Sequence, residues 1–215
     1  MSVPRRLPTI APYDLPKEND LPVSRADWRP DPARAALLVH DMQRYFLAAF
    51  APDAAPLAPL TANVAALLAA ARACGMPVFY TAQKGAQDRR DRGLQADLWG
   101  PGMSAAPEHE DIVPSVTPTE TDFVLVKHRY SAFQRSNLET LMRARNRDQL
   151  LITGVYAHIG CQATAFDAFQ RDIQPFFVAD ALADFSREWH DTALATVADC
   201  SGVVLSARQA QELIE

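Results

Sequence analysis

Six short, apolar and largely β-branched runs alternate with helical patterns along the chain, and this alternation constrains the fold more than any other feature of the sequence. Strands are predicted at Ala35–Val39, Val78–Tyr80, Phe123–Val126, Leu150–Thr153, Phe176–Val178 and Val203–Leu205. Helices are predicted at Leu60–Ala73, Ser136–Arg145, Gly160–Gln170, Ser186–Asp199 and Ala207–Ile214. Strands that alternate with helices pair in parallel, and a parallel sheet is covered on both faces. The sequence therefore predicts an α/β fold: a three-layer α/β/α domain with a six-stranded parallel doubly wound sheet.

Two local signals refine this arrangement. Seven of the 16 prolines fall within residues 1–32, so we expect residues 1–31 to form an extended Pro-rich arm that packs on the domain. Residues 32–215 are then expected to form a single domain. Ser136 and Glu139 have the spacing of a capping box, which predicts a helix that starts at Ser136.

Charge and cysteine usage exclude several classes of protein. The formal net charge is −5, with 21 basic against 26 acidic residues, so no basic surface is expected for nucleic acid or anionic lipid. The three cysteines, Cys74, Cys161 and Cys200, form no disulfide framework and no paired metal motif, which favours a reducing cytoplasm. No signal peptide is expected at the start, and no apolar run of about 18 residues predicts a membrane span.

The residues that follow the predicted strands are the candidates for a site, because ligands of doubly wound sheets bind beyond the carboxyl ends of the strands. Asp41 follows the first strand, Gln83 the second and Lys127 the third, while Cys161 lies past the fourth. Taken alone, Asp41 is equally well explained as a helix cap with Lys127 as its surface partner. The convergence of an acid, an amide, a lysine and a thiol on one edge favours a functional site.

Several ordered stretches resemble isochorismatases. They are His40–Gln43, Lys127 with Arg129–Phe133, Gly154–Cys161, Asp172–Phe176 with Ala183–Ser186, and Leu98–Gly102. The resemblance runs from about residue 10 to the C-terminus. It implies an isochorismatase-like hydrolase fold, a homodimer, and cleavage of the enolpyruvyl ether of isochorismate to pyruvate and 2,3-dihydro-2,3-dihydroxybenzoate.

A vinyl ether hydrolyses when its terminal CH₂ carbon is protonated, so a positioned general acid is the one indispensable group. Asp41 is the candidate, and the resemblance assigns the same role to its position, with Lys127 as the second catalytic residue. Lys127 beside Asp41 would keep the carboxyl ionised. We expect the substrate, a small dicarboxylate, to return the proton by pairing its carboxylates with Lys127 and the arginines, so that Asp41 faces apolar carbon and added negative charge.

The resemblance also implies the members of the binding pocket. Gln83 matches an amide that donates to the substrate, and Arg92 matches an arginine that binds a substrate carboxylate, although Arg89 and Arg90 lie close to it in the sequence. Tyr156 and the backbone amide of Gly160, at an expected helix start, match contacts to the enolpyruvyl carboxylate. An apolar wall is expected from Tyr45, Phe46 and Trp99.

Other polar residues fit a structural interpretation better. His40 and His158 are expected to make structural hydrogen bonds, and Arg129 fits a scaffold ion pair as well as a ligand contact. The metal-binding pattern of related amidases is missing, because Tyr45-Phe46-Leu47 offers no ligand. We therefore expect no metal and no cofactor.

Three alternatives remain open at this point. Related amidases use an acid, a lysine and a cysteine, here Asp41, Lys127 and Cys161, although ether cleavage does not require a thiol. Phenazine-type enzymes cleave 2-amino-2-deoxyisochorismate to trans-2,3-dihydro-3-hydroxyanthranilate instead. Siderophore-type enzymes often carry a C-terminal aryl carrier domain, for which we expect no room before Glu215, so that a separate carrier protein stays possible.

His128 stands where the family pattern has tryptophan. A scaffold without activity is disfavoured, because the candidate acid, amide and lysine are all retained.

Overall fold

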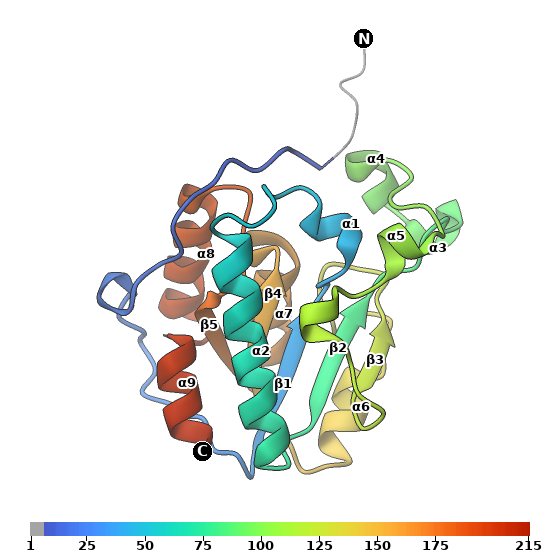
Figure 1. The fold of residues 1–215 in the computed structure, drawn as a ribbon. Coiled ribbons are helices and arrows are strands. Elements are labelled where there is room, and N and C mark those ends of the chain that lie inside the picture. The colour runs from blue at the N-terminus through green and yellow to red at the C-terminus, as the bar shows by residue number, and fades with distance from the viewer. Residues whose placement is uncertain (1–6) are drawn as a thin grey trace.

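The sheet has six strands in the order β3-β2-β1-β4-β5-β6, and every pairing is parallel. This computed structural model describes residues 7–215 (Figure 1). The strands are β1 (Ala35–His40), β2 (Val78–Ala82), β3 (Phe123–Val126), β4 (Gln149–Val155), β5 (Gln174–Ala183) and β6 (Val203–Leu205). The predicted three-layer α/β/α class is confirmed.

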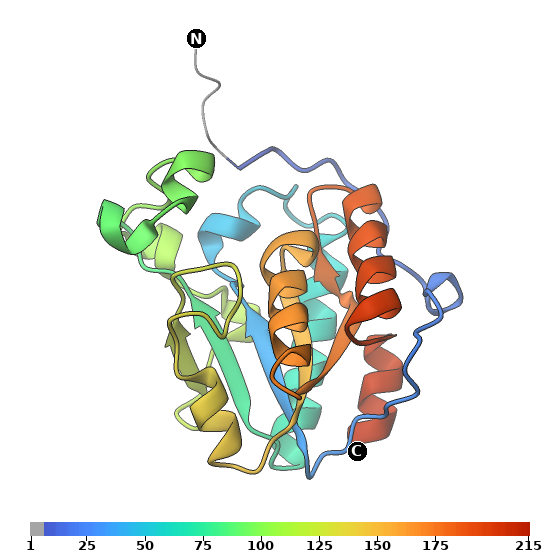
Figure 2. The ribbon, with the colours of Figure 1, turned by 180° about the vertical axis from the view of Figure 1, so that it is seen from behind.

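Helices cover both faces of the sheet. Helices α2 (Leu57–Ala73) and α9 (Ala207–Ile214) lie on one face (Figure 1), and α6 (Leu138–Arg143), α7 (Gln162–Phe169) and α8 (Arg187–Cys200) lie on the other (Figure 2). Alternate residues of β1 point to opposite layers, with Leu37 and Val39 in the α2 cluster and Leu38 in the α7 cluster. Burial on both faces explains why β1 reads as a continuous apolar run.

Three predicted helix starts are wrong. Helix α2 begins at Leu57, three residues before the predicted Leu60. Helix α6 begins at Leu138 and has no side-chain cap, because the Ser136 hydroxyl donates to Ala132 O (2.5 Å) and accepts from Leu138 N (3.2 Å) within the preceding turn. Glu139 pairs with Arg143 instead of closing a capping box. The helix predicted from Gly160 is preceded by a π-helical turn, Ala157–Cys161, so Gly160 lies inside this turn and not at the first position of a helix.

The N-terminal segment runs extended over the surface, across the carboxyl end of the sheet and down beside α8 and α9 (Figure 1). Ile10 forms a parallel bridge with Phe50, and its N–H donates to Ala49 O (2.8 Å). The Tyr13 hydroxyl accepts from Asp184 N (2.7 Å). The predicted arm starts at residue 1, and its residues 1–6 lie outside the described part of the chain.

Several short helices were not predicted. Helix α1 (Arg44–Leu47) follows β1, and α3 (Arg89–Arg92), α4 (Gln95–Trp99) and α5 (Pro107–Glu110) lie in the long connection between β2 and β3. We call residues 84–111 of this connection the cover segment. It projects beside the carboxyl ends of β1 and β2 (Figure 1). Helices of four or five residues are unstable alone, which is why periodicity did not reveal them.

The strand order positions the site. From β1 the chain builds β2 and β3 on one side of the sheet and then β4, β5 and β6 on the other, so the direction of winding switches between β1 and β4. A crevice forms at such a switch point, outside the carboxyl ends of the strands.

Among the helices of residues 7–215, none combines the length and the apolar character that a membrane span requires.

Candidate active site

A cavity lies at the switch point, between the carboxyl ends of β1, β2 and β4 and the cover segment. Its lining comprises Leu7, His40, Asp41, Tyr45, Phe46, Gln83, Arg92, Gln95, Trp99, Gly102, Met103, Lys127, Tyr130, Val155, Tyr156, Ile159 and Gly160. All of the predicted catalytic and substrate-binding residues line this cavity, and Cys161 does not.

Asp41 lies at the base of the cavity in a dense hydrogen-bond network. Its Oδ1 accepts from Thr81 Oγ1 (2.6 Å), and its Oδ2 accepts from Gln83 Nε2 (2.9 Å) and lies 3.0 Å from Lys127 Nζ. Asp41 has a positive φ of 49°, a conformation that is uncommon for residues other than glycine and that aspartate adopts more readily than most. The tight turn aims the carboxylate at the three donors.

The pKa of Asp41 reflects two opposing effects. Burial raises the pKa, but the charge on Lys127, the neighbouring His40 and the hydrogen bonds from Thr81 and Gln83 together outweigh it. The pKa of Asp41 therefore lies below its usual range in the free protein, and the carboxyl is ionised at neutral pH. This agrees with the expectation that Lys127 holds the candidate acid in its charged form.

The ammonium group of Lys127 contacts three acceptors within the protein. Besides Asp41, its Nζ donates to Arg129 O (2.8 Å) and Tyr130 O (3.3 Å), so three partners surround an ammonium group that has three protons. The residue is only 2% exposed. Lys127 thus neutralises Asp41 and fixes the loop after β3, and the structure gives it no open donor for a substrate carboxylate.

Arg92 is a buried cation that lines the cavity. It is 7% exposed, its Nε donates to Gly100 O (2.6 Å), and within residues 7–215 no carboxylate lies within ion-pairing distance of its guanidinium group. The guanidinium packs on Gly102, where a Cβ atom would come within 2.6 Å of Arg92 Cζ. Burial lowers the pKa of Arg92. A buried cation without a countercharge favours binding of an anionic ligand.

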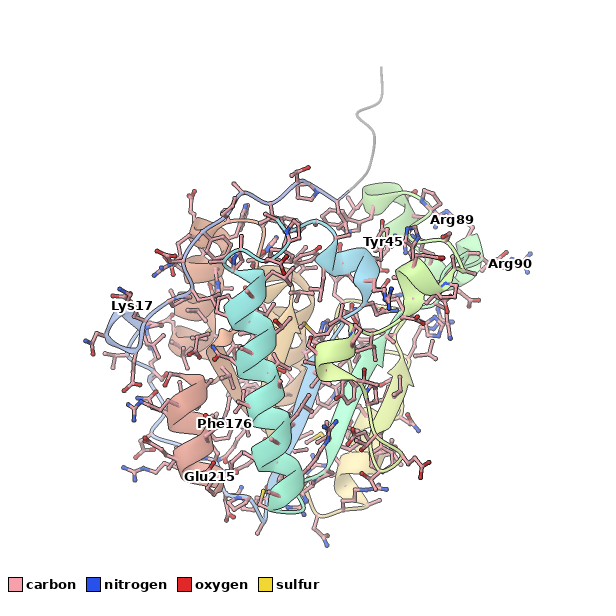
Figure 3. The ribbon with its side chains drawn as sticks, viewed as in Figure 1. Lys17, Tyr45, Arg89, Arg90, Phe176 and Glu215 are labelled. Atoms are coloured by element: carbon pink, nitrogen blue, oxygen red, sulfur yellow. The ribbon has the colours of Figure 1, made fainter. Side chains whose placement is uncertain are left out.

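The neighbouring arginines lie outside the cavity. Arg89 pairs with Asp97, and Arg89 and Arg90 extend from the outer edge of the cover segment (Figure 3). Arg129 donates to the carbonyl oxygens of Asp91 and His128, both at 2.6 Å, so it serves as scaffold. Among the arginines of the loop, Arg92 is therefore the one that lines the cavity.

Aromatic side chains form an apolar wall. The Tyr156 ring lies 4.5 Å from the Phe185 ring and 6.2 Å from the Phe46 ring, centroid to centroid. The Tyr156 hydroxyl donates to Phe46 O (2.6 Å), and burial raises its pKa well above the ordinary value. Trp99 Nε1 donates to the Tyr130 hydroxyl (2.7 Å). Tyr156 thus presents its ring to the cavity while its hydroxyl is used within the protein.

The two histidines make structural hydrogen bonds. The His40 ring nitrogens lie 2.9 Å from Val155 O and 3.3 Å from Tyr130 O, and His158 Nδ1 lies 2.5 Å from Asp184 Oδ1. Gly160 leaves room for the His40 ring, because a Cβ atom at residue 160 would come within 2.3 Å of His40 Cε1. Within residues 7–215, no group of three or more His, Cys, Asp or Glu side chains is arranged to hold a metal ion.

Cys161 is buried in the layer beneath the cavity. Its exposed fraction is 0%, and it packs in the core cluster that includes α7. Burial and the nearby negative charges of Asp41 and Asp184 raise the pKa of the thiol well above its ordinary value. Both effects disfavour the thiolate that a nucleophilic cysteine requires.

Sequence reasoning missed several residues of the site. Thr81 pairs in register with His40, so its hydroxyl beside Asp41 could have been inferred once the two strands were aligned. Gln95 and Met103 come from the cover segment, which has no periodic pattern to place them. Leu7 reaches the cavity from the N-terminal segment.

Comparison with known proteins identifies the family. The Isochorismatase domain model matches residues 35–209. An isochorismatase of Bacillus subtilis is 49% identical over 201 residues, which cover 93% of this chain and 64% of that protein. The phenazine biosynthesis protein PhzD of Pseudomonas fluorescens is 47% identical over 200 residues, covering 93% of this chain and 96% of that protein. The crystal structure of a cysteine hydrolase from Pseudomonas syringae pv. phaseolicola has a TM-score of 0.77 at 26% identity, covering 90% of this chain and 97% of that one. The chain spans less than two thirds of the length of the Bacillus protein, but the matched region includes every strand of the sheet and nearly all of the cavity lining. This chain belongs to the isochorismatase family.

Proposed function

We propose that this protein is a hydrolase that cleaves the enolpyruvyl vinyl ether of isochorismate, giving 2,3-dihydro-2,3-dihydroxybenzoate and pyruvate. The observation that carries the proposal is a buried carboxyl, Asp41, held by Lys127 and Gln83 in a cavity that also contains the buried cation Arg92. This arrangement combines a proton donor with a receptor for an anionic substrate. The similarity to the isochorismatase of Bacillus subtilis supports it.

In the proposed reaction, Arg92 binds a substrate carboxylate and the aromatic wall packs against the ring. The bound dianion and the exclusion of water raise the pKa of Asp41, so that the carboxyl takes up a proton. Asp41 transfers this proton to the terminal CH₂ carbon, which becomes the methyl group of pyruvate. Water adds to the resulting oxocarbenium carbon, and the hemiketal loses the ring alcohol to release pyruvate. Lys127 keeps Asp41 in place and stabilises its carboxylate after proton transfer.

The amino analogue of isochorismate is the second candidate substrate. The similarity to PhzD, which extends over 96% of that protein, supports this reading. Cleavage of 2-amino-2-deoxyisochorismate to trans-2,3-dihydro-3-hydroxyanthranilate and pyruvate uses the same proton transfer. The two substrates differ in a hydroxyl or an amino group on one ring carbon, so the proposed proton transfer is the same for both.

A pyruvate-release assay with both substrates tests the proposal. We expect release by the wild type and loss of release in Asp41→Ala. Asp122→Ala is the matched control, since Asp122 is also a buried carboxyl (side chain 3% exposed) paired to a cation, Arg72, but lies outside the cavity. Failure of the wild type to release pyruvate from either substrate would refute the proposal. Full activity of Asp41→Ala would refute the role of Asp41 alone.

The amidase alternative has its own test. A reaction that proceeds through a thiolate at Cys161 would be abolished in Cys161→Ala, whereas vinyl ether cleavage needs no thiol. We expect Cys161→Ala to keep pyruvate release within about threefold of the wild type, because the side chain does not reach the cavity. Complete loss of turnover in a variant that still folds would favour the amidase.

We also propose a homodimer in the cytoplasm as the working form of the protein. The exposed, reduced cysteines Cys74 and Cys200 are compatible with a reducing compartment. Val124 and Val126 are exposed apolar residues on the edge strand β3 and offer a surface for a second copy. Sedimentation equilibrium gives the mass in solution, and a monomer at micromolar concentration would contradict the dimer.

A further inference from the structure

Gln43 is a fully buried amide that does not line the cavity, yet it contacts both the residue that precedes the cover segment and a residue near the end of the segment. Its exposed fraction is 0%. Gln43 Oε1 accepts from Gln83 N (2.7 Å), and Gln43 Nε2 donates to Gln83 O (2.9 Å) and to Glu110 O (2.7 Å). Gln83 directly precedes the cover segment and Glu110 lies at its far end. The Gln43 side chain therefore links the two stretches of backbone through which the segment leaves and rejoins the domain.

Further hydrogen bonds join the beginning of the cover segment to its end. Glu110 Oε1 accepts from Gly85 N (2.6 Å), and Glu110 Oε2 lies 3.3 Å from Lys84 Nζ. Gln43 itself forms an isolated antiparallel bridge with Ile112. The base of the cover segment is thus a small polar clasp centred on Gln43.

The clasp connects to the site in two ways. Gln43 satisfies both backbone groups of Gln83, whose side-chain Nε2 donates to Asp41 Oδ2 (2.9 Å). The cover segment carries Arg92, the cation proposed to bind the substrate, on helix α3. Helices as short as α3 and α4 depend on tertiary contacts for their position, so the location of Arg92 depends on how the segment is anchored.

We propose that Gln43 is a positioning residue, which fixes Gln83 against Asp41 and closes the cover segment so that Arg92 faces the cavity. This inference rests on the proposed vinyl ether hydrolysis for its kinetic consequence. Its structural consequence, closure of the segment, is independent of the substrate. Loss of the clasp should open the segment locally while the sheet, with its own packing, stays folded.

The test compares Gln43→Leu with Gln149→Leu. Gln149 is a matched control, since it is 1% exposed, accepts from Asp31 N (2.7 Å) and donates to Arg29 O (3.0 Å), but lies at the opposite end of the sheet. Both variants leave buried backbone groups without partners and should lose similar thermal stability. With substrate, we expect the KM of Gln43→Leu to rise about tenfold or more, and that of Gln149→Leu to stay within about threefold of the wild type.

Limited trypsin digestion gives a readout that needs no activity. Lys84, Arg89 and Arg90 are exposed cleavage sites in the cover segment (Figure 3 shows the two arginines). We expect native-state cleavage at these sites, mapped by mass spectrometry, to be about tenfold faster in Gln43→Leu than in the wild type or Gln149→Leu. Gln43→Glu keeps the size of the side chain but places a carboxylate oxygen against the carbonyl oxygens of Gln83 and Glu110. We expect its cleavage rate to be raised as in Gln43→Leu.

Equal KM values and equal cleavage rates in Gln43→Leu and Gln149→Leu would overturn the proposal, because they would make Gln43 a purely structural residue. An inactive wild type would refute the vinyl ether reaction instead. In that case the cleavage rates still decide whether Gln43 closes the segment.

Discussion

Replacing Lys127 by methionine isolates the charge that holds Asp41. The two side chains are 3% and 5% exposed, with 3.0 Å between Nζ and Oδ2, so the substitution leaves a carboxylate buried without its countercharge. Removing one partner of a buried ion pair costs about 3–5 kcal/mol. For a protein of this size, 1 kcal/mol shifts the Tm by about 2–4 °C, so we expect the Tm to fall by roughly 6–20 °C at neutral pH.

The size of this loss depends on pH in a defined direction. In the wild type the pKa of Asp41 is lowered, so its contribution to stability is present above the ordinary carboxyl pKa of about 3.9 and lost as the pH falls. In Lys127→Met the attraction of the ammonium group is lost, while burial still raises the pKa of Asp41 against the remaining hydrogen bonds from Thr81 and Gln83, so this pKa is higher than in the wild type. The folded variant therefore binds its proton more tightly than the folded wild type and gains less stability as the pH rises. The difference between the two proteins therefore grows from about pH 4 upward.

Urea denaturation at several pH values between about 5 and 8 measures this difference as a free energy of unfolding. The double variant Asp41→Asn with Lys127→Met contains neither charge and should recover most of the loss. Arg72→Met, at the Arg72–Asp122 pair with the arginine 30% exposed, should cost less. A loss below about 1 kcal/mol, or one that is equal at pH 5 and pH 8, would refute the view that Lys127 chiefly compensates the buried charge of Asp41.

Three further predictions concern the proposed reaction. Arg92→Lys should raise the KM about tenfold or more in steady-state assays, because a lysine cannot keep the Nε contact to Gly100 O and still offer a planar pair of donors; an unchanged KM would exclude Arg92 as the carboxylate receptor. Tyr156→Phe should change the KM by less than about threefold and cost about 1 kcal/mol in urea denaturation, because the hydroxyl bonds to Phe46 O; a large KM effect would mean that the hydroxyl contacts substrate. Because the pKa of Asp41 is lowered in the free protein, kcat/KM should decline as the pH rises from about 5 to 8, while kcat stays level to higher pH; parallel profiles would contradict proton uptake on binding.

The sheet was predictable because its strands are short apolar runs, which in β1 and β4 are buried on both faces. Phe123–Val126, Val203–Leu205 and the helix Ala207–Ile214 have the predicted bounds, since each is a continuous apolar run or a capped amphipathic pattern between turn residues. β5 is longer than predicted, extending over Gln174–Ala183, because its polar and alanine positions lower the local strand signal. Pairing with β4 on one side and β6 on the other compensates for that weak propensity.

The site was predictable where it depends on strand ends and not where it depends on the cover segment. Asp41, Gln83 and Lys127 follow three adjacent strands, so the topology alone brings them together. The choice of Arg92 over Arg89 and Arg90 came from the family resemblance and not from spacing, because the direction of each arginine depends on the orientation of a four-residue helix held by tertiary contacts. The hydrogen bonds from Lys127 to backbone carbonyl groups were also not predictable, because the spacing of residues does not show how the loop after β3 folds.

The narrow base of the cover segment has a consequence for how proteins of this kind can diverge. The segment leaves and rejoins the domain at one point beside Gln43, while Asp41, the proposed general acid, directly follows β1. Changes between residues 84 and 111 can therefore alter the surroundings of Arg92 while the strands that position Asp41 stay the same. The part of the cavity wall that this segment supplies, with Arg92, Trp99 and Met103, is thus separable from the proposed proton donor, as expected where loops on a rigid scaffold carry specificity.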